Sequence, residues 1–195
     1  MRAAINPRAG RVHARGFTLI EIMVVVTIIA LMLVIGVPAM SEFATDQHVR
    51  TVASDINSGI SLARAKAIES SHRVYMQKLG INWNNGWILY VDMNDNAAYD
   101  AGVDLKLTQF DGFATGTLYI CTSPVGAFTT QIIFRPDGRI VRAGAVTAND
   151  GVYVVDPMTP GTPISSYKIR GVQFGLSGRT TVLKLNGQPL PCVAN

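Results

Sequence analysis

The chain has 195 residues, which is enough for one modest folded domain beside any membrane segment. Its formal net charge of +4 comes from four arginines that precede Gly16, so the rest of the chain is formally neutral. The sequence has no phosphate-binding glycine loop, H-E-x-x-H pair or nucleophile-elbow serine, which argues against an enzyme, and nothing in it indicates a cofactor.

The first 40 residues have the pattern of a basic leader followed by a membrane span. Residues 1–16 are basic and contain proline and glycine, which is typical of a cytoplasmic leader. Residues 17–40 are apolar almost throughout and, at ~1.5 Å per helical residue, can cross a bilayer core of ~30 Å. Glu21 is the exception, because a carboxylate within the span costs roughly a few kcal/mol and needs a partner or a proton. The positive-inside rule predicts that the C-terminal side of the helix lies outside the cytoplasm.

A cleavable secretory signal is the alternative explanation of the same stretch. Val37-Pro38-Ala39 is an acceptable cleavage site, and the mature chain would then begin at Met40. Glu21 inside the apolar region argues against this alternative, as does a helical pattern that continues directly past the site.

Residues 41–70 continue the helix as an amphipathic segment. Apolar side chains recur there at spacings of three and four, which places them on one face: Val49, Val52, Ile56, Ile60, Ala63 and Ala67. Gly36 and Pro38 predict a bend, because Pro38 lacks a backbone donor and crowds the preceding turn. The sequence therefore predicts one long helix, apolar in its first half and buried along one stripe in its second.

Residues 71–195 predict a β-rich domain. Short β-branched and aromatic stretches alternate with turn residues, over 72–79, 86–93, 117–122, 130–135, 138–143, 151–156, 168–176 and 179–185. The clearest hairpin is the turn Pro136-Asp137-Gly138 between Phe134 and Ile140. The predicted fold class is therefore α+β, with the long N-terminal helix packed on a small antiparallel β domain.

The two cysteines, Cys121 and Cys192, fit no metal or redox motif. If the domain lies outside the cytoplasm, a disulfide between them is expected. In the chain-entropy model a bridge across so long a loop contributes about 4 kcal/mol, and it would hold the last residues in place.

An acidic stretch runs from Asp92 to Asp104. Asp92, Asn94 and Asn96 supply oxygens at alternate positions, like the beginning of a calcium loop. Ala97 stands where such a loop needs glycine, and no glutamate closes it. We therefore predict a solvated, Asx-rich turn with no metal, and keep calcium as the weaker alternative.

The segment Gly16-Phe17-Thr18-Leu19-Ile20-Glu21, followed by the apolar run, resembles the N-terminus of the type IV pilin-like superfamily. In that superfamily a prepilin peptidase cuts after the glycine and methylates the new N-terminus. The resemblance implies cleavage between Gly16 and Phe17, removal of leader 1–16 and N-methylation of Phe17. It also implies that Glu21 acts in assembly, where its carboxylate would meet the Phe17 amine of a neighbouring subunit.

The same resemblance implies a location and partners. The helix of residues 17–40 would anchor the protein as a single pass in the cell inner membrane, with a periplasmic globular domain. The expected partners are the prepilin peptidase, the membrane and, through the N-terminal helix, other major or minor pilins or pseudopilins. The helix would later become part of the core of a pilus or pseudopilus.

The globular part resembles the GspH/FimT group of minor pilins and pseudopilins. Residues 62–76, 86–105 and 132–140 carry this resemblance, together with the pair Gly178-Arg179. It implies a pilin-like lollipop fold and a structural role as a minor pilin in the initiation or tip complex of a type IV pilus. A minor pseudopilin of type II secretion is the alternative, and the sequence separates the two poorly.

DNA binding is a second alternative. Some FimT-type minor pilins act as DNA receptors in natural transformation through a C-terminal Gly-Arg-x-Arg motif. The corresponding place here is Gly178-Arg179-Thr180-Thr181, without the second arginine. Residues 157–195 carry four basic side chains and no acidic one, namely Lys168, Arg170, Arg179 and Lys184. Lys168, Arg170 and Lys184 could act as further phosphate contacts, although four spaced, solvated strand residues explain the same basic tail.

Overall fold

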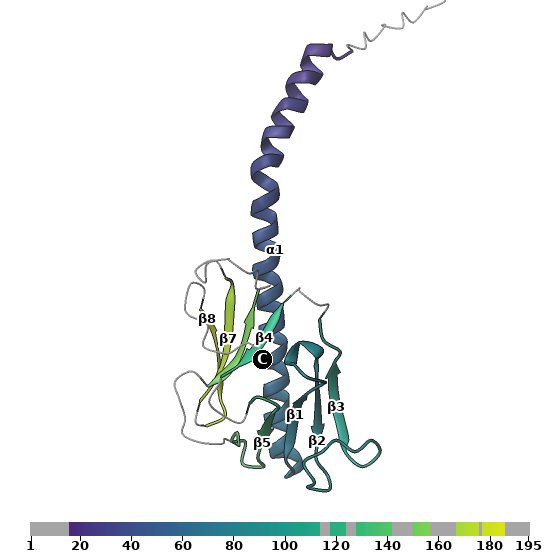
Figure 1. The fold of residues 1–195 in the computed structure, drawn as a ribbon, viewed down its shortest axis with the longest axis vertical. Helices are drawn as coiled ribbons and strands as arrows, with labels where there is room; N and C mark the ends of the chain where they lie inside the picture. Colours follow the sequence, from purple (N-terminus) through teal and green to yellow (C-terminus); the bar gives the residue numbers. More distant parts are fainter. Residues whose placement is uncertain are drawn as a thin grey trace, which may run out of the picture. The chain divides into compact units, whose positions relative to one another are not determined.

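The computed structural model describes residues 16–113, 118–123, 128–141, 150–156, 167–175 and 177–185 (Figure 1). The chain divides into two compact units, Met1–Glu42 and Phe43–Asn195. The helix α1, Leu19–Ser70, contributes its first part to one unit and its second part to the other.

α1 begins with a capping box. The backbone N–H of Thr18 donates to Glu21 Oε2 at 3.4 Å, and Thr18 Oγ1 accepts from the Glu21 N–H at 3.3 Å. Two of the N–H groups that a helix start leaves without partners are satisfied in this way. α1 then continues through Gly36 and Pro38 as a single helix, so the predicted bend remains a prediction.

The apolar part of α1 is not covered by any of the residues that the structure describes. Its large side chains are exposed, Leu19 at 79% and Val34 at 74% among them. Among the described residues, α1 is the one helix whose length and composition suffice to cross a membrane, and its most apolar stretch has no buried residue. Exposed apolar surface on this scale is expected of a segment that meets lipid or other helices.

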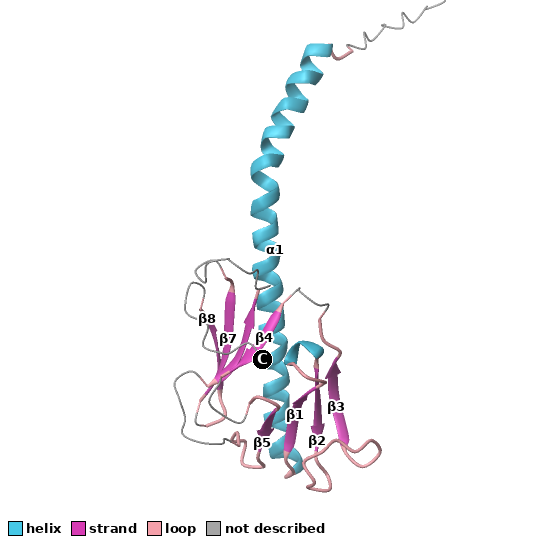
Figure 2. Ribbon diagram, in the orientation of Figure 1, coloured by secondary structure: helices cyan, strands magenta, loops and turns pink. Residues whose placement is uncertain are grey.

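The second unit contains two four-stranded antiparallel sheets (Figure 2). The first has the order β3-β2-β1-β5, with β1 at Val74–Lys78, β2 at Trp87–Val91, β3 at Leu105–Phe110 and β5 at Gln131–Phe134. The second has the order β4-β6-β7-β8, with β4 at Tyr119–Thr122, β6 at Gly151–Val155, β7 at Ile169–Phe174 and β8 at Thr180–Lys184. A short 3₁₀ helix, η1 at Trp83–Asn85, connects β1 and β2.

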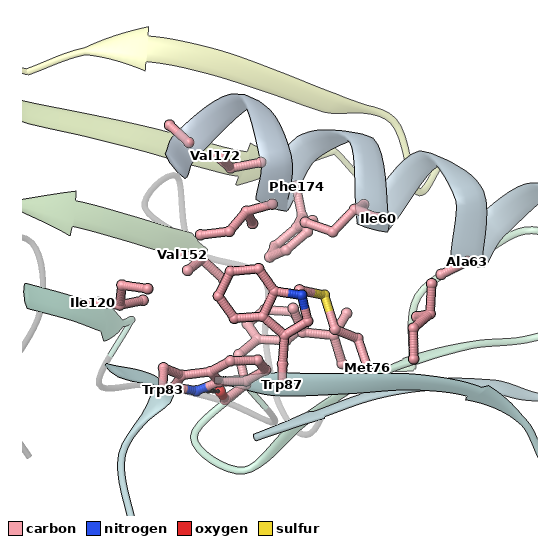
Figure 3. Close-up of a cluster of buried hydrophobic side chains, with 14 of the residues drawn as sticks. Ile60, Ala63, Met76, Trp83, Trp87, Ile120, Val152, Val172 and Phe174 are labelled. Carbon is pink, nitrogen blue, oxygen red and sulfur yellow. Dashed lines mark hydrogen bonds between the residues drawn. The ribbon is translucent and has the colours of Figure 1, made fainter. Parts of the chain in front are cut away.

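The main core lies between the second half of α1 and the inner faces of both sheets (Figure 3). All six predicted stripe residues of α1 are buried, and Ala53 joins them. Strand β6 shows the alternation that separates the two sides of its sheet. Val152 and Val154 enter the core with α1, whereas Tyr153 and Val155 belong to a separate cluster that also contains Cys121.

Two local predictions differ from the structure. The sequence patterns missed β3, because this edge strand is largely exposed and its alternation is weak. In the stretch 138–143 the described residues form a single antiparallel bridge, Phe134 to Ile140, in place of a strand. The predicted hairpin turn is confirmed, since the Gly138 N–H donates to Arg135 O at 2.8 Å and Arg135 N–H donates to Arg139 O at 2.9 Å.

Candidate functional site

Three places carry the residues that the sequence singled out, and the N-terminal segment is the first. Gly16 and Phe17 are exposed, as a cleavage site must be. The Glu21 carboxylate contacts the backbone of Thr18 within its own chain. This capping role was missed, although the spacing T-x-x-E from Thr18 to Glu21 is its usual sequence signal.

The basic C-terminal residues are the second place, and the structure shows clearly what Arg170 does there. Its side chain is only 6% exposed, and Nη2 lies 2.7 Å from Asp46 Oδ1. The other oxygen of Asp46 lies 3.0 Å from Arg50 Nε, so the two arginines share one carboxylate. The prediction that Arg170 contacts phosphate is therefore corrected: a buried, ion-paired guanidinium is not presented to a polymer.

The other basic residues of the tail are accessible but do not gather at one point. Lys184 is exposed and pairs with Arg170 in the register of β7 and β8, while Lys168 precedes β7 and is half-buried. Arg179 is exposed beyond the opposite end of β8. At ~3.3 Å per strand residue, Arg179 and Lys184 are roughly 16 Å apart along the strand.

Two hollows line the contact between α1 and the β8 hairpin. The first, of about 490 Å³, is bordered by Arg64 of α1 and by Arg179. The second, of about 420 Å³, is bordered by Arg50, by the buried Arg170 and by Lys184. No acidic side chain is among the described residues that border either hollow.

We call Arg50, Arg64, Arg179 and Lys184 the basic seam. A hydrogen bond of 2.6 Å from Thr180 Oγ1 to Asn57 Oδ1 joins α1 to β8 within it. The sequence reasoning missed the helical half of this surface because it considered the C-terminal tail alone. The signal was present, since positions 50, 57 and 64 are two helical turns apart and share a face.

The backbone conformation explains why residue 178 of the Gly178-Arg179 pair is glycine. Gly178 has φ of +75°, and a Cβ at this position would lie 2.3 Å from the carbonyl oxygen of Gly138. The turn before β8 therefore contacts the turn at 136–138 backbone to backbone. Only glycine fits there, whatever Arg179 does.

The acidic stretch is the third place, and its predicted solvation is wrong at both ends. Residues 93–98 are exposed, but Asp92 is fully buried and Asp104 is 8% exposed. Asp92 Oδ2 accepts from the Ala97 N–H at 2.9 Å, whereas Asp92 Oδ1 is buried without a hydrogen-bond partner. Asp104 accepts the N–H groups of Met93 at 2.9 Å and Asp100 at 2.7 Å.

Hydrogen bonds, charge and burial in this stretch shift the pKa values of Asp100 and of the nearby Tyr90. The amides of Asn94 and Asn96 hold the pKa of Asp100 below its ordinary value. Burial, followed by Tyr75 and the Asp92 carboxylate, raises the pKa of Tyr90 far above its ordinary value. Among the residues that the structure describes, no three His, Cys, Asp or Glu side chains already converge as a metal site.

Of the predicted disulfide pair, one partner is described. Cys121 is buried in β4, on the side of its sheet that carries Tyr153 and Val155. Cys192 lies outside the described residues, so the pairing stays a prediction.

The fold and the N-terminal segment together define the class of type IV pilin-like proteins. The model of the prokaryotic N-terminal methylation motif matches residues 11–37, which include Gly16, Phe17 and Glu21. The model described as type II transport protein GspH matches residues 52–171, more than half of the chain. The chain belongs to the GspH family, and as a minor pilin or pseudopilin it is a structural subunit and not an enzyme.

Two relatives accompany these matches. Pilin-like protein PilA1 of Thermus thermophilus is 33% identical over 98 residues, which are 49% of this chain. The match spans 60% of the length of that curated relative. The crystal structure of the type IV minor pilin FimU of Pseudomonas aeruginosa matches 77% of this chain and 99% of its own at a TM-score of 0.51. At 16% identity this second likeness shows a shared fold.

Proposed function

We propose that the chain is a minor pilin of a type IV pilus, in the initiation or tip complex. The observation that carries the proposal is the methylation motif over residues 11–37 at the head of a helix whose apolar side chains are exposed. Prepilin peptidase would cut between Gly16 and Phe17 and methylate Phe17. The apolar half of α1 would anchor the subunit in the inner membrane with its domain in the periplasm, and would then pack among other pilin helices.

Glu21 is the residue that we propose directs docking. In the isolated chain its carboxylate is held by the N–H of Thr18, one residue from the proposed new N-terminus. In a filament the same carboxylate would meet the Phe17 amine of a neighbouring subunit, so that two groups costly in an apolar setting neutralise each other. Such a polar contact within an apolar helix bundle also sets register.

Two substitutions separate capping from charge. Glu21→Gln keeps a side chain that can complete the capping box but removes the negative charge, whereas Glu21→Ala removes both. We expect both variants to be processed and inserted in the membrane and to be absent from sheared filaments. Glu42→Gln, in the same helix but beyond the predicted span, is the matched control and should enter filaments normally.

The readout is the ratio of variant protein in sheared filaments to that in membranes, measured by immunoblotting. Normal incorporation of Glu21→Gln would show that the charge has no part in docking. Failure of Glu21→Gln to be processed would overturn the assignment to assembly, because the residue would then act earlier.

A minor pseudopilin of type II secretion is the alternative within the class. The description of the matched family model, type II transport protein, favours it. Deletion of the gene distinguishes the two, because loss of surface filaments supports the pilus and loss of protein export with intact filaments supports the pseudopilus.

The basic seam supports a second candidate function, that of a minor pilin that binds DNA. Its four cations lie along α1 and β8, over a length that spans several phosphates at ~3.4 Å per nucleotide of one strand. Arg50 also pairs with Asp46 at 3.0 Å, but its side chain is 53% exposed and so stays accessible to a phosphate. Contacts of this kind give a sequence-independent affinity that falls with salt. Arg64 and Arg179 border the same hollow and would take the place of the paired arginines of the motif that this chain lacks. Arg64 Nε donates to Gly138 O at 3.1 Å, which fixes its side chain at that hollow.

Retention of the protein on double-stranded DNA across a salt series tests the seam. We expect Arg64→Ala and Arg179→Ala each to weaken binding and to reduce the salt slope by about one. Lys106→Ala, an exposed cation on β3 of the other sheet, is the control and should leave binding unchanged. No retention of the unaltered protein at low salt, or an equal loss in the control, would remove DNA from its functions.

A disulfide between Cys121 and Cys192 completes the proposal for the periplasmic domain. The burial of Cys121 in β4 supports a structural rather than a reactive thiol. The bridge would attach the C-terminal end of the chain to the second sheet.

A further inference from the structure

The acidic stretch connects two neighbouring strands. Val91 at the end of β2 pairs with Leu105 at the start of β3. Because the two strands are antiparallel, Asp92 and Asp104 stand opposite each other one position beyond this pair. Residues opposed in this way have Cα atoms roughly 5 Å apart. Two carboxylates that are both buried therefore lie at the two ends of one loop.

Such an arrangement is unfavourable without a positive charge. Like charges directly opposed in a sheet destabilise it, and a buried carboxylate oxygen without a donor loses hydration that nothing replaces. The ion pairs formed between described residues include none with Asp92, Asp95, Asp100 or Asp104. The sequence has no lysine or arginine between Lys78 and Lys106, and Arg73, whose carbonyl oxygen accepts the Asp92 N–H at 2.9 Å, has an exposed side chain.

The backbone of the loop has the form that a cation-binding loop needs. Ala97, at the position where calcium loops carry glycine, has φ of +62° and so adopts the left-handed conformation that glycine favours. The Ala97 N–H and Asp92 Oδ2 are bonded at 2.9 Å, which leaves Oδ1 as the unpartnered oxygen. The loop has no glutamate at its closing position, but Asp104 stands one position later than the closing acid of a standard loop.

We propose that residues 92–104 form a calcium-binding site. Asp92 supplies the first carboxylate through Oδ1, and Asp104 closes the loop from the opposite strand. Asp100 would be the third ligand, because the amide N–H groups of Asn94 at 2.9 Å and Asn96 at 2.6 Å fix its Oδ2 in place and leave its other oxygen for the ion. Asn94 and Asn96 position Asp100 from the side, because their own Oδ1 atoms accept the N–H groups of Asn96 at 3.3 Å and Ala98 at 2.9 Å. The ligands are then the three carboxylates, and oxygen ligands of this kind are those that calcium prefers.

This site is separate from the assembly function proposed for Glu21 and from the basic seam. Calcium would lock the β2–β3 connection and would neutralise the opposed carboxylates, so it would stabilise the folded domain. Because the ligands belong to the folded loop and are dispersed in the unfolded chain, binding would raise the melting temperature by mass action.

The experiment uses the full-length protein in detergent, freed of divalent ions with chelator. We expect CaCl₂ to raise the melting temperature by several degrees, with half of the effect at ~10⁻⁴–10⁻³ M as in extracellular calcium modules, and MgCl₂ to do less. Terbium should give luminescence sensitised by Tyr99, which lies within the loop, and excess calcium should displace it.

Three substitutions make the test specific. Asp92→Asn removes the unpartnered charge, so it should raise the melting temperature without calcium and abolish the calcium response. Asp104→Asn should also abolish the response. Asp95→Asn removes the same charge from an exposed position of the same loop and should keep the full response.

The proposal is overturned if the unaltered protein shows neither a melting shift nor displaceable terbium luminescence at about 10 mM calcium. It is also overturned if Asp95→Asn loses the response as Asp92→Asn does, because the effect would then be one of net charge alone. A folded Asp92→Asn protein, verified by circular dichroism, that still binds calcium would overturn the assignment of the first ligand.

Discussion

Arg170 and Asp46 show how one partner changes what a residue can do. By composition Arg170 belongs to a basic tail, but its guanidinium is buried and shares Asp46 with Arg50. The partner of Arg170, Asp46, lies 124 positions away in the sequence. The sequence does not reveal this pair, because it forms only when α1 and β7 pack together. Asp92 in the acidic loop differs from Arg170: it is also buried, but one of its carboxylate oxygens has no hydrogen-bond donor.

Asp156 gives a prediction that depends on pH. Burial raises the pKa of its carboxyl above the ordinary value, although Lys168 acts against this. A raised pKa in the folded state means that ionisation favours unfolding. Stability is therefore lost as the pH rises from the unfolded-state pKa to the folded-state pKa, and the full loss is present above both. We expect Asp156→Asn to raise the melting temperature at pH 7 and to have a shrinking effect as the pH falls through 4.

Thermal unfolding of both proteins from pH 3.5 to 8 measures this effect. A lower melting temperature for Asp156→Asn at pH 7 would show that the charged form is stabilised by a partner. A gain of equal size at every pH would show that the effect does not arise from ionisation.

At the scale of elements, the periodicity of apolar residues predicted the buried face of α1 but not every strand of the sheets. The stripe of α1 was predictable because spacings of three and four describe one helical face, and every member of it is buried. Strand β3 was not predictable in the same way, because an exposed edge strand has little reason to alternate. The helical half of the basic seam was missed for a different reason: Arg64 meets Arg179, and Arg50 meets Lys184, only when β8 docks on α1.

The stripe allows a direct test of how α1 holds the domain. Ile56 is 1% exposed in the core, whereas Leu62 of the same helix is 39% exposed. We expect Ile56→Ala to cost about 2–5 kcal/mol of unfolding free energy and Leu62→Ala less than about 1 kcal/mol. Chemical denaturation in detergent measures both, and equal losses would contradict the assignment of the buried face.

At the scale of the whole molecule, the two units have different needs. The unit Phe43–Asn195 buries its apolar side chains on a stripe of α1 and two sheets, so it has a core of its own. The apolar side chains of α1 before Glu42 are exposed and require a membrane or neighbouring helices. A methylation motif at the start of that helix and a GspH domain at its end are what a subunit needs if it is stored in lipid and used in a filament.

The central claim is that this chain is processed as a pilin and assembled through its N-terminal helix. Intact mass spectrometry of the protein recovered from sheared filaments tests it most directly, with reduced and non-reduced samples compared. We predict a chain that begins at N-methylated Phe17, with a mass lower by two hydrogens before reduction owing to the Cys121–Cys192 bridge. A chain that keeps residues 1–16, or one that begins at Met40 and is found only as soluble protein, would contradict the account.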